Sequence, residues 1–403
     1  MLVKTDRPDP RLLSQTSYLL ALVLICFFAA TQTASSESSG SGSYLESLLL
    51  KAKQKDLAAH PYWKLLLHYK PRILLPGERS LIDDSTFFLS PDGKRDAEAE
   101  LEATIKSFFD LSTKDRTELI SQCRFVARYR WLKNQLNFDS KQLPEAECPH
   151  FEEWRENMAA SGMTLVFPSA YFNNPASMYG HTLLRIDAAD QNEQTRLLAY
   201  TTSFTASTGE DGGLAFAAKG LLGGYLGSFS VIPYYIEVTQ YSDMENRDIW
   251  EYQLALNQEE VDRAVFHLWE LTTTYFDYYF FDENCSYHLL SLLEAAKPEL
   301  KLTDEFKWWA LPSDTVKVIT ENYPELINKI VFRPAASSKM QARAENLSSS
   351  EIEQAKGIAL GADENWQEDL QRLEAPDKAA VLDMAIDYRS YLNEKERGKD
   401  TAG

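Results

Sequence analysis

The sequence lacks the features that mark several common enzyme and binding classes. No run of lysine or arginine is longer than two residues in a chain of net charge −19, which excludes the basic footprint of a nucleic-acid-binding protein. The motifs His-Glu-x-x-His and Gly-x-Ser-x-Gly and the phosphate-binding loop are all absent, and the enzymes that carry them are thereby excluded. We therefore expect no cofactor, no metal and no nucleic-acid partner.

Long apolar runs are also scarce. The one clear apolar stretch, residues 18–30, is too short for an ordinary membrane span. It follows three basic residues and precedes small residues at 34–36, which is the pattern of a signal peptide. We predict a signal peptide over residues 1–36 and a mature chain that is soluble outside the cytoplasm. An uncleaved membrane anchor is the alternative.

Cysteine is rare, and its count is informative. Cys123, Cys148 and Cys285 remain after residue 36, and in an oxidising compartment an odd number leaves one thiol over. Cys123 and Cys148 enclose a short loop, so a disulfide between them would leave Cys285 free. Three unpaired thiols are the alternative.

The periodicity of apolar residues predicts an α+β protein with helical additions at both ends. Residues 35–44 are rich in Ser and Gly and indicate a flexible linker. Residues 209–228, with seven glycines, indicate a mobile apolar loop. The predicted domains are a linker and helical N-terminal domain at 37–136, a catalytic domain at 137–312 and a helical C-terminal region at 313–403. Within the second domain we predict strands at 163–168, 181–187, 197–204, 231–241 and 248–256, and helices at 259–275 and 285–296.

The segment around Cys285 carries the chemistry. Asp282 or Asn284 can cap the helix that follows, because both side chains accept hydrogen bonds from free backbone N–H groups. Cys285 then lies in the first helical turn, where the helix dipole and unpaired amides lower the pKa of a thiol. The same amides can stabilise the oxyanion that forms when a thiolate attacks a carbonyl.

A thiolate nucleophile needs a base, and His181 is the best candidate. It follows Gly180 at the start of a predicted strand, a place from which its ring can reach a sheet edge. His288 is an alternative base, since it lies three residues after Cys285 on the same helix face. A zinc site formed by Cys285, His288 and His181 is a further alternative, indicated by the Cys-x-x-His spacing.

Four strings in this order resemble the Lnb N-terminal periplasmic domain family. They are NPASMYGHTLLR at 174–185, GLLGGY at 220–225, ENRDIWEY at 245–252 and NCSY at 284–287. The order of histidine first, then Asn-Cys at a helix start, is similar to permuted papain-like enzymes of the NlpC and lecithin:retinol acyltransferase kind. The resemblance implies a permuted papain-like (NlpC-type) core in a periplasmic protein, with Cys285 as nucleophile and His181 as base.

The family namesake is a lipoprotein N-acyltransferase, so the resemblance also implies acyl transfer through an acyl-enzyme. We expect a lipid or lipoprotein substrate and peripheral contact with a membrane. Unlike the namesake, this sequence has no downstream membrane helices. Two alternatives stay open: a cell-wall peptide amidase and an envelope binding or assembly domain without catalysis.

The spacing does not assign the remaining site residues. Candidates for an orienting or oxyanion role are Asn284, Asn174, Ser203 and Asp248. Candidates for substrate binding are Arg185, Arg247 and Tyr287, although strand arginines more often pair with local carboxylates.

Overall fold

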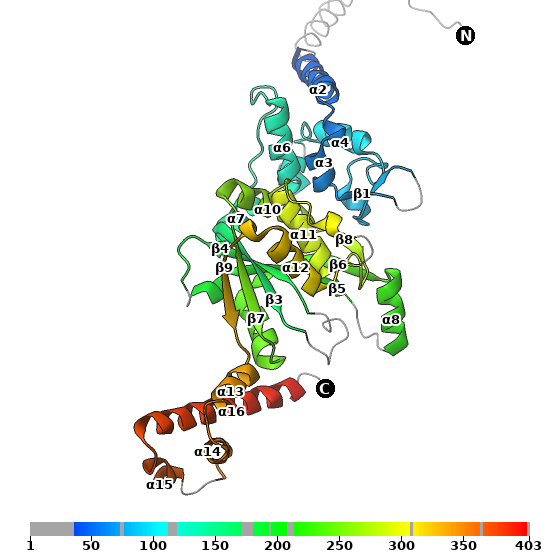
Figure 1. The fold of residues 1–403 in the computed structure, drawn as a ribbon. Helices are drawn as coiled ribbons and strands as arrows, with labels where there is room; N and C mark the ends of the chain where they lie inside the picture. Colours follow the sequence, from blue (N-terminus) through cyan, green and yellow to red (C-terminus); the bar gives the residue numbers. More distant parts are fainter. Residues whose placement is uncertain are drawn as a thin grey trace, which may run out of the picture.

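A computed structural model describes most of the chain. The described residues are 36–72, 76–111, 119–170, 180–192, 195–207, 213–306, 309–362 and 366–400. The predicted signal peptide lies outside them, apart from Ser36. A helical N-terminal region, a central β-sheet with its helices and a C-terminal helical lobe follow one another along the chain (Figure 1).

The central sheet has seven strands in the order β8-β6-β5-β4-β3-β7-β9, and every neighbouring pair is antiparallel. The strands are β3 (Ala160–Pro168), β4 (Leu183–Ala188), β5 (Tyr200–Ser207), β6 (Tyr225–Pro233), β7 (Ile249–Leu254), β8 (Tyr275–Tyr278) and β9 (Ile327–Arg333). The fold is therefore α+β, as predicted.

The two faces of the sheet are covered differently. Alternate residues such as Leu165, Leu184 and Phe204 belong to the main core, together with residues of α10 (Gln258–Leu271) and α11 (Cys285–Ala296). The intervening Val166 and Leu183 belong to a smaller cluster with the residues that follow β6. Both α10 and α11 match the predicted helices, and α11 begins and ends at the predicted residues.

The N-terminal region packs helices and a two-stranded sheet around Trp63. Its elements are α2 (Ser36–Gln54), α3 (Pro61–Leu66), β1 (Tyr69–Pro71), β2 (Glu78–Ser80), α4 (Ala97–Ser107), α5 (Ser121–Arg124) and α6 (Val126–Leu136). The predicted flexible linker is wrong, because α2 starts within the Ser/Gly stretch. Leu48 and Ala52 of α2 are buried in the core, and this packing outweighs the weak helix propensity of the preceding residues.

Buried charges join the N-terminal region to the sheet domain. Arg128 on α6 contacts Glu100 on α4 at 2.9 Å and Glu270 on α10 at 3.5 Å, and all three side chains are fully buried. Removing one member of such a cluster leaves a buried charge unpaired, which costs about 3–5 kcal/mol. The two regions therefore hold each other in one arrangement.

A pair of histidines makes a second link. His68 Nε2 lies 3.0 Å from His267 Nε2 on α10, and His68 Nδ1 lies 3.1 Å from the hydroxyl of Ser291 on α11. Burial, with neighbouring charges, holds the pKa of His68 well below its ordinary value. Through its contact with Ser291, the neutral ring of His68 thereby connects α11 to the N-terminal region.

The segment between β5 and β7 differs from the prediction. The described part of the glycine-rich stretch, residues 213–228, forms α8 (Gly213–Leu222) and the first part of β6 rather than a loop. Residues 209–212 lie outside the described part of the chain. The strand predicted at 231–241 ends at Pro233, because proline cannot donate to the ladder. Helix α9 (Tyr234–Val238) and a π-helical turn, Thr239–Met244, follow it.

The C-terminal region is helical but contains a strand that the sequence did not predict. After α12 (Pro312–Asn322), β9 adds to the sheet edge beside β7. Its apolar side chains are partly exposed, for example Ile330 at 51%, so its alternation is weak. Helices α13 (Ala336–Ala344), α14 (Ser349–Leu360), α15 (Trp366–Gln371) and α16 (Ala375–Asp400) then form a lobe with its own small core, set apart from the sheet (Figure 1).

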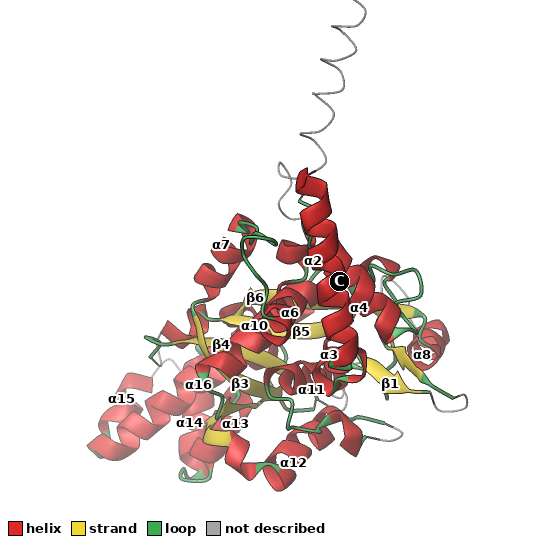
Figure 2. Cartoon of the chain, turned by 90° about the horizontal axis from the view of Figure 1, so that it is seen from above, coloured by secondary structure: helices red, strands yellow, loops and turns green. Residues whose placement is uncertain are grey.

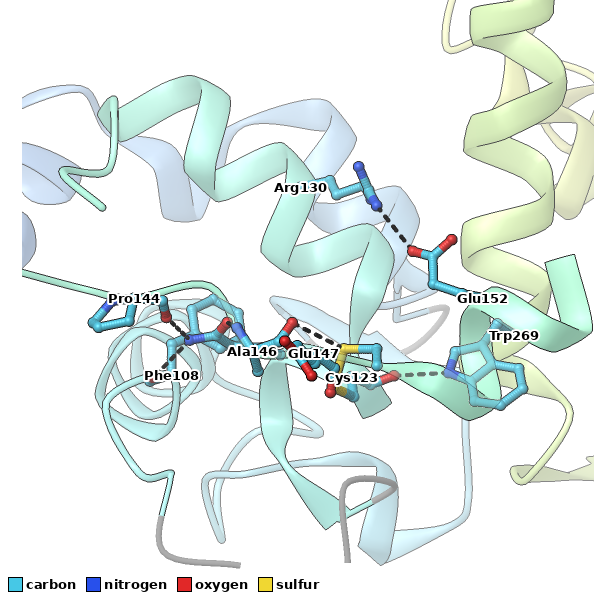
Figure 3. Close-up of a disulfide and its surroundings, with 10 residues drawn as sticks. Phe108, Cys123, Arg130, Pro144, Ala146, Glu147, Glu152 and Trp269 are labelled. Carbon is cyan, nitrogen blue, oxygen red and sulfur yellow. Dashed lines mark hydrogen bonds and ion pairs between the residues drawn. A yellow bond between two sulfur atoms is a disulfide. The ribbon is translucent and has the colours of Figure 1, made fainter. Parts of the chain in front are cut away.

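Cys123 and Cys148 form the expected disulfide, and Cys285 is a free, buried thiol. The bond ties α5 to the start of α7 (Pro149–Met158). Trp269 of α10 donates its indole N–H to the Cys123 carbonyl at 2.8 Å, so the crosslink sits against the sheet domain (Figure 3). No helix among the described residues has both the length and the apolar character needed to cross a membrane.

Loss of the disulfide should lower stability by an amount set by its loop. The cysteines are 25 residues apart, and closing a loop of that size in the unfolded chain is worth about 3.5 kcal/mol. The double variant Cys123→Ala, Cys148→Ala should lose that free energy of unfolding in urea titrations. An unchanged midpoint relative to the oxidised wild type would contradict this.

His288 should make the fold sensitive to acid. Both its ring nitrogens are buried without a hydrogen-bond partner among the described residues, and burial lowers its pKa to about 3. The unfolded chain binds this proton from about pH 6.5 downward, so stability should fall by about 1.4 kcal/mol per pH unit between pH 6.5 and 3 from this residue alone.

The variant His288→Phe tests this account, because the ring lies 4.1 Å from that of Phe204 and 4.3 Å from that of Phe276, centre to centre. At pH 7.5 the free energy of unfolding of this variant should be equal to or greater than that of the wild type. Its slope against pH between about pH 6.5 and 3 should be smaller by the amount that corresponds to one bound proton. An unaltered slope would show that His288 does not titrate in this way.

Candidate active site

Asn284 builds the start of the helix that carries Cys285. Its side-chain oxygen accepts from the backbone N–H groups of Ser286 at 3.1 Å and Tyr287 at 3.3 Å. Its amide nitrogen donates to the carbonyls of Phe280, at 3.1 Å, and Ala310. Asn284 is thus the predicted cap, and Asp282 is not. Because its hydrogen bonds are all made within the protein, it is a positioning residue and not an oxyanion donor.

Cys285 is the first residue of α11, and its side chain is almost buried. The sulfur lies 3.8 Å from the Ser286 hydroxyl, which in turn lies 2.8 Å from the hydroxyl of Thr182. The backbone N–H of Thr182 also donates to the sulfur. These contacts bring the end of the loop before β4 against the start of α11, 103 residues apart in the sequence.

His181 meets Cys285 at this junction. Burial on its own would raise the pKa of the Cys285 thiol, but attraction to His181 and hydrogen bonds from His181, Ser286 and the Thr182 N–H bring it down to about 7. Burial likewise disfavours the charged imidazole, and Cys285 more than compensates and raises the pKa of His181. The sulfur and the ring therefore favour a thiolate–imidazolium pair.

Gly180 allows the approach of His181. Its φ is +94°, and a Cβ there would lie 2.6 Å from the ring of Phe167. Any other residue would be strained at this φ and would also clash with the strand β3. Gly180 thus sets the direction in which the chain enters β4, and this direction places the imidazole of His181 next to Cys285.

Two residues next to His181, Glu237 and Tyr241, were not predicted from the sequence. Glu237 is buried on α9, raises the pKa of His181 through its charge, and accepts a hydrogen bond from Tyr241. The Tyr241 ring lies 5.8 Å from the imidazole, centre to centre. Glu237 and Tyr241 are four residues apart and share a helix face, a signal that the predicted strand at 231–241 concealed.

Tyr278 is a second residue that sequence reasoning missed. Its hydroxyl contacts the Cys285 sulfur and accepts from the Cys285 backbone N–H, and burial raises its pKa, so it stays protonated. The amides of Cys285, Ser286 and Tyr287 thus all have partners. The prediction that free first-turn amides form an oxyanion site is therefore wrong. The protonated hydroxyl of Tyr278 lies at the same place.

His288 does not contact the sulfur. Its ring packs among the aromatic rings of the core, and burial is the cause of its lowered pKa. The alternative base is therefore wrong, and the zinc hypothesis loses one of its three ligands. Within the described part of the chain, no group of three or more His, Cys, Asp or Glu residues is placed to hold a metal ion.

The other candidate orienting residues lie elsewhere. The Ser203 hydroxyl is 3.1 Å from that of Ser230, and it points away from the sheet face on which its neighbour Phe204 meets α11. Asp248 accepts from the Ala335 N–H at 2.8 Å. Neither orients His181. Asn174 lies outside the described residues.

The three predicted substrate-binding residues are occupied by the protein itself. Arg185 pairs with Glu251 at 2.7 Å and Asp187 at 2.6 Å. Arg247 is fully buried, donates to the carbonyls of Pro168 and Ser169 and pairs with Glu245. Tyr287 is buried and bonds to Thr303. These predictions were wrong, because each side chain faces a buried partner rather than a cleft.

An apolar surface lies near the site. Leu221 and Leu222 at the end of α8 are 53% and 79% exposed. Leu226 on β6 is 50% exposed, but it points to the sheet face opposite to α11. The Phe280 N–H donates to the Gly220 carbonyl at 2.9 Å, and a Cβ at Gly220 would lie 2.2 Å from the Phe280 ring. The end of α8 therefore packs directly against the segment that leads into Cys285, at the periphery of the molecule (Figures 1 and 2).

Comparison with known families divides the chain in three. Residues 150–322 match the Lnb N-terminal periplasmic domain. Residues 55–135 and 330–402 match two families described only as domains of unknown function, DUF7843 and DUF7842. No curated protein and no solved structure matches. The description of the central family agrees with the expected export. The part of the chain that matches the Lnb N-terminal periplasmic domain therefore contains both Cys285 and His181.

Proposed function

We propose that the protein is a thiol-dependent acyltransferase or hydrolase that acts through Cys285 and His181. The observation that carries the proposal is the contact between the two residues at a capped helix start, with the pKa of Cys285 at about 7. A buried thiol without such a partner would stay protonated and inert. A histidine before a strand and a cysteine at a helix start are also the arrangement of a permuted papain-like core.

The first half-reaction forms an acyl-enzyme. The Cys285 thiolate attacks the carbonyl carbon of an ester, thioester or amide, and a C–S bond forms. The bond from that carbon to the leaving group then breaks as His181 donates its proton to the leaving oxygen, sulfur or nitrogen. The Tyr278 hydroxyl, next to the sulfur, donates to the oxyanion in between.

The second half-reaction returns the enzyme to its starting state. Water or an amine attacks the thioester carbon, and His181 accepts the proton that it loses. The C–S bond breaks, and the acyl group leaves as an acid or an amide. Burial raises the pKa of Glu237, and in its charged form it favours the imidazolium form of His181, which makes it a positioning residue.

The apolar end of α8 favours a fatty acyl chain over a cell-wall peptide as the acyl group. Leu221 and Leu222 there are more than half exposed, and this helix end packs against the segment that leads into Cys285. Exposed apolar side chains of this kind are typical of contact with an apolar ligand or a bilayer. We therefore propose a lipid or lipoprotein acyl donor and peripheral contact with the membrane.

The pH dependence of alkylation at Cys285 should show how far His181 lowers the pKa of the thiol. The rate of reaction of Cys285 with iodoacetamide should rise with pH and reach half its maximum near pH 7. In His181→Gln the attraction is lost while burial remains, so the midpoint should move above the ordinary value of about 8.5. Peptide mass spectrometry gives the rates.

The variant His288→Phe is the matched control for that measurement, because His288 is buried on the same helix without contacting the sulfur. It should keep the wild-type midpoint. Equal midpoints for wild type and His181→Gln would show that His181 does not activate the thiol.

A charge on the apolar surface should discriminate between acyl chains. Leu222→Asp should lower kcat/KM for p-nitrophenyl dodecanoate about tenfold, since contact with two or more methylenes is lost, and leave p-nitrophenyl acetate nearly unchanged. The matched control is Leu198→Asp, at a leucine 70% exposed in the segment before β5. Equal losses of kcat/KM for both esters would contradict a fatty acyl substrate and would favour the hydrolysis of cell-wall amides.

A further inference from the structure

A hollow of about 580 Å³ lies where the N-terminal region meets the sheet domain. Its walls come from α3, α6 and α10, and from Pro298 and Glu299, which follow the end of α11. Cys285 is at the opposite end of this helix of 12 residues, about 18 Å away at 1.5 Å per residue. The hollow is therefore separate from the thiol site.

Aromatic side chains from three helices form part of the wall: Tyr62 on α3, Trp131 on α6 and Phe266 on α10. Trp131 is partly exposed and stacks on the fully buried Trp63, with ring centres 5.8 Å apart and planes 13° apart. Trp63 in turn donates to the Ala97 carbonyl at 3.0 Å. The indole of Trp131 is thus held in one orientation before any ligand arrives.

The charged side chains of the hollow balance one another. Three are basic and three acidic: Arg130, Lys133, Arg263, Glu259, Asp262 and Glu299. Arg263 pairs with Glu259 at 2.8 Å. Arg130 pairs with Glu152 at 3.7 Å, just outside the hollow (Figure 3). A purely anionic or purely cationic ligand would therefore meet as much repulsion as attraction.

The remaining polar side chains include Asn134 and Gln135, each with a donor and an acceptor, and His60, whose ring centre lies 5.2 Å from that of Trp131. A mixture of fixed aromatic surface, paired charges and amides suits a neutral ligand that has apolar C–H faces and many hydroxyl groups. Each sugar hydroxyl both donates and accepts, so it can bond to a carboxylate and a guanidinium in turn. We propose that this hollow binds a saccharide.

The position of the hollow gives the N-terminal region a role. Tyr62 and Trp131 belong to the part that matches a domain of unknown function, and Phe266 and Arg263 belong to the Lnb N-terminal periplasmic domain. A saccharide would thus touch both parts and stabilise their contact.

Isothermal titration of the full mature chain with chitotetraose, cellotetraose and maltotetraose tests the proposal. At least one should bind saturably and change tryptophan fluorescence. Trp131→Ala should weaken that binding at least about tenfold, the effect of losing about 1.4 kcal/mol of contact. Asp262→Ala and Asn134→Ala, which alter partly or fully exposed polar side chains, should weaken binding without a loss of folding.

Two control variants distinguish binding in this hollow from the loss of any exposed tryptophan and from the chemistry of Cys285. Trp309→Ala removes a tryptophan that is 63% exposed and lines a different hollow, and it should bind as the wild type does. Cys285→Ala should also bind normally, so a failure of the thiol chemistry leaves this result untouched.

Three outcomes would overturn the proposal. They are no saturable binding of any of the three oligosaccharides, binding that survives both Trp131→Ala and Asp262→Ala, and binding of a zwitterionic tripeptide such as Ala-Glu-Lys in place of every saccharide.

Discussion

Burial of the Cys285 sulfur opposes its ionisation, and the imidazole of His181 reverses this effect. Each group alone would be neutral in the interior, because a lone charge loses its hydration there. Together, each moves the pKa of the other toward its charged form. The features of the site follow from this attraction: Gly180 that lets the ring approach, Glu237 and Tyr241 behind it, and the capped helix start in front.

The attraction requires that two distant segments be held within reach of one another. Asn284 fixes the first turn of α11, and β4 fixes the residues after His181 through its pairing with β3. The N-terminal region holds α11 from the other side through His68 and Ser291, and holds α10 through Arg128 and Glu270. Since these contacts are buried and charged or polar, they tolerate only one relative position. The helical addition is therefore part of the structure that shapes the site.

Local signals in the sequence were enough to predict some parts of this arrangement. A cap residue followed by apolar helical spacing predicted α11 to the residue. The pairing of His181 with Cys285 was predicted with the help of the family resemblance, since the residues alone left His288 open as the base. The disulfide was favoured because Cys123 and Cys148 enclose a short loop, and the structure confirms it over three unpaired thiols. Tyr278, Glu237 and Tyr241 were missed because their roles arise from how β8 and α9 pack in three dimensions. Arg185 and Arg247 were misjudged for the same reason, since their carboxylate and carbonyl partners are set by pairing between strands.

The central claim is that Cys285 becomes covalently acylated, and intact mass spectrometry tests it most directly. After brief exposure of the mature chain to p-nitrophenyl dodecanoate and quenching in acid, the protein should gain the mass of one dodecanoyl group. Peptide mapping should place it on Cys285, hydroxylamine should remove it as expected of a thioester, and Cys285→Ala should gain none. An adduct of equal yield in Cys285→Ala, or no adduct in the wild type while the ester is still consumed, would contradict the account.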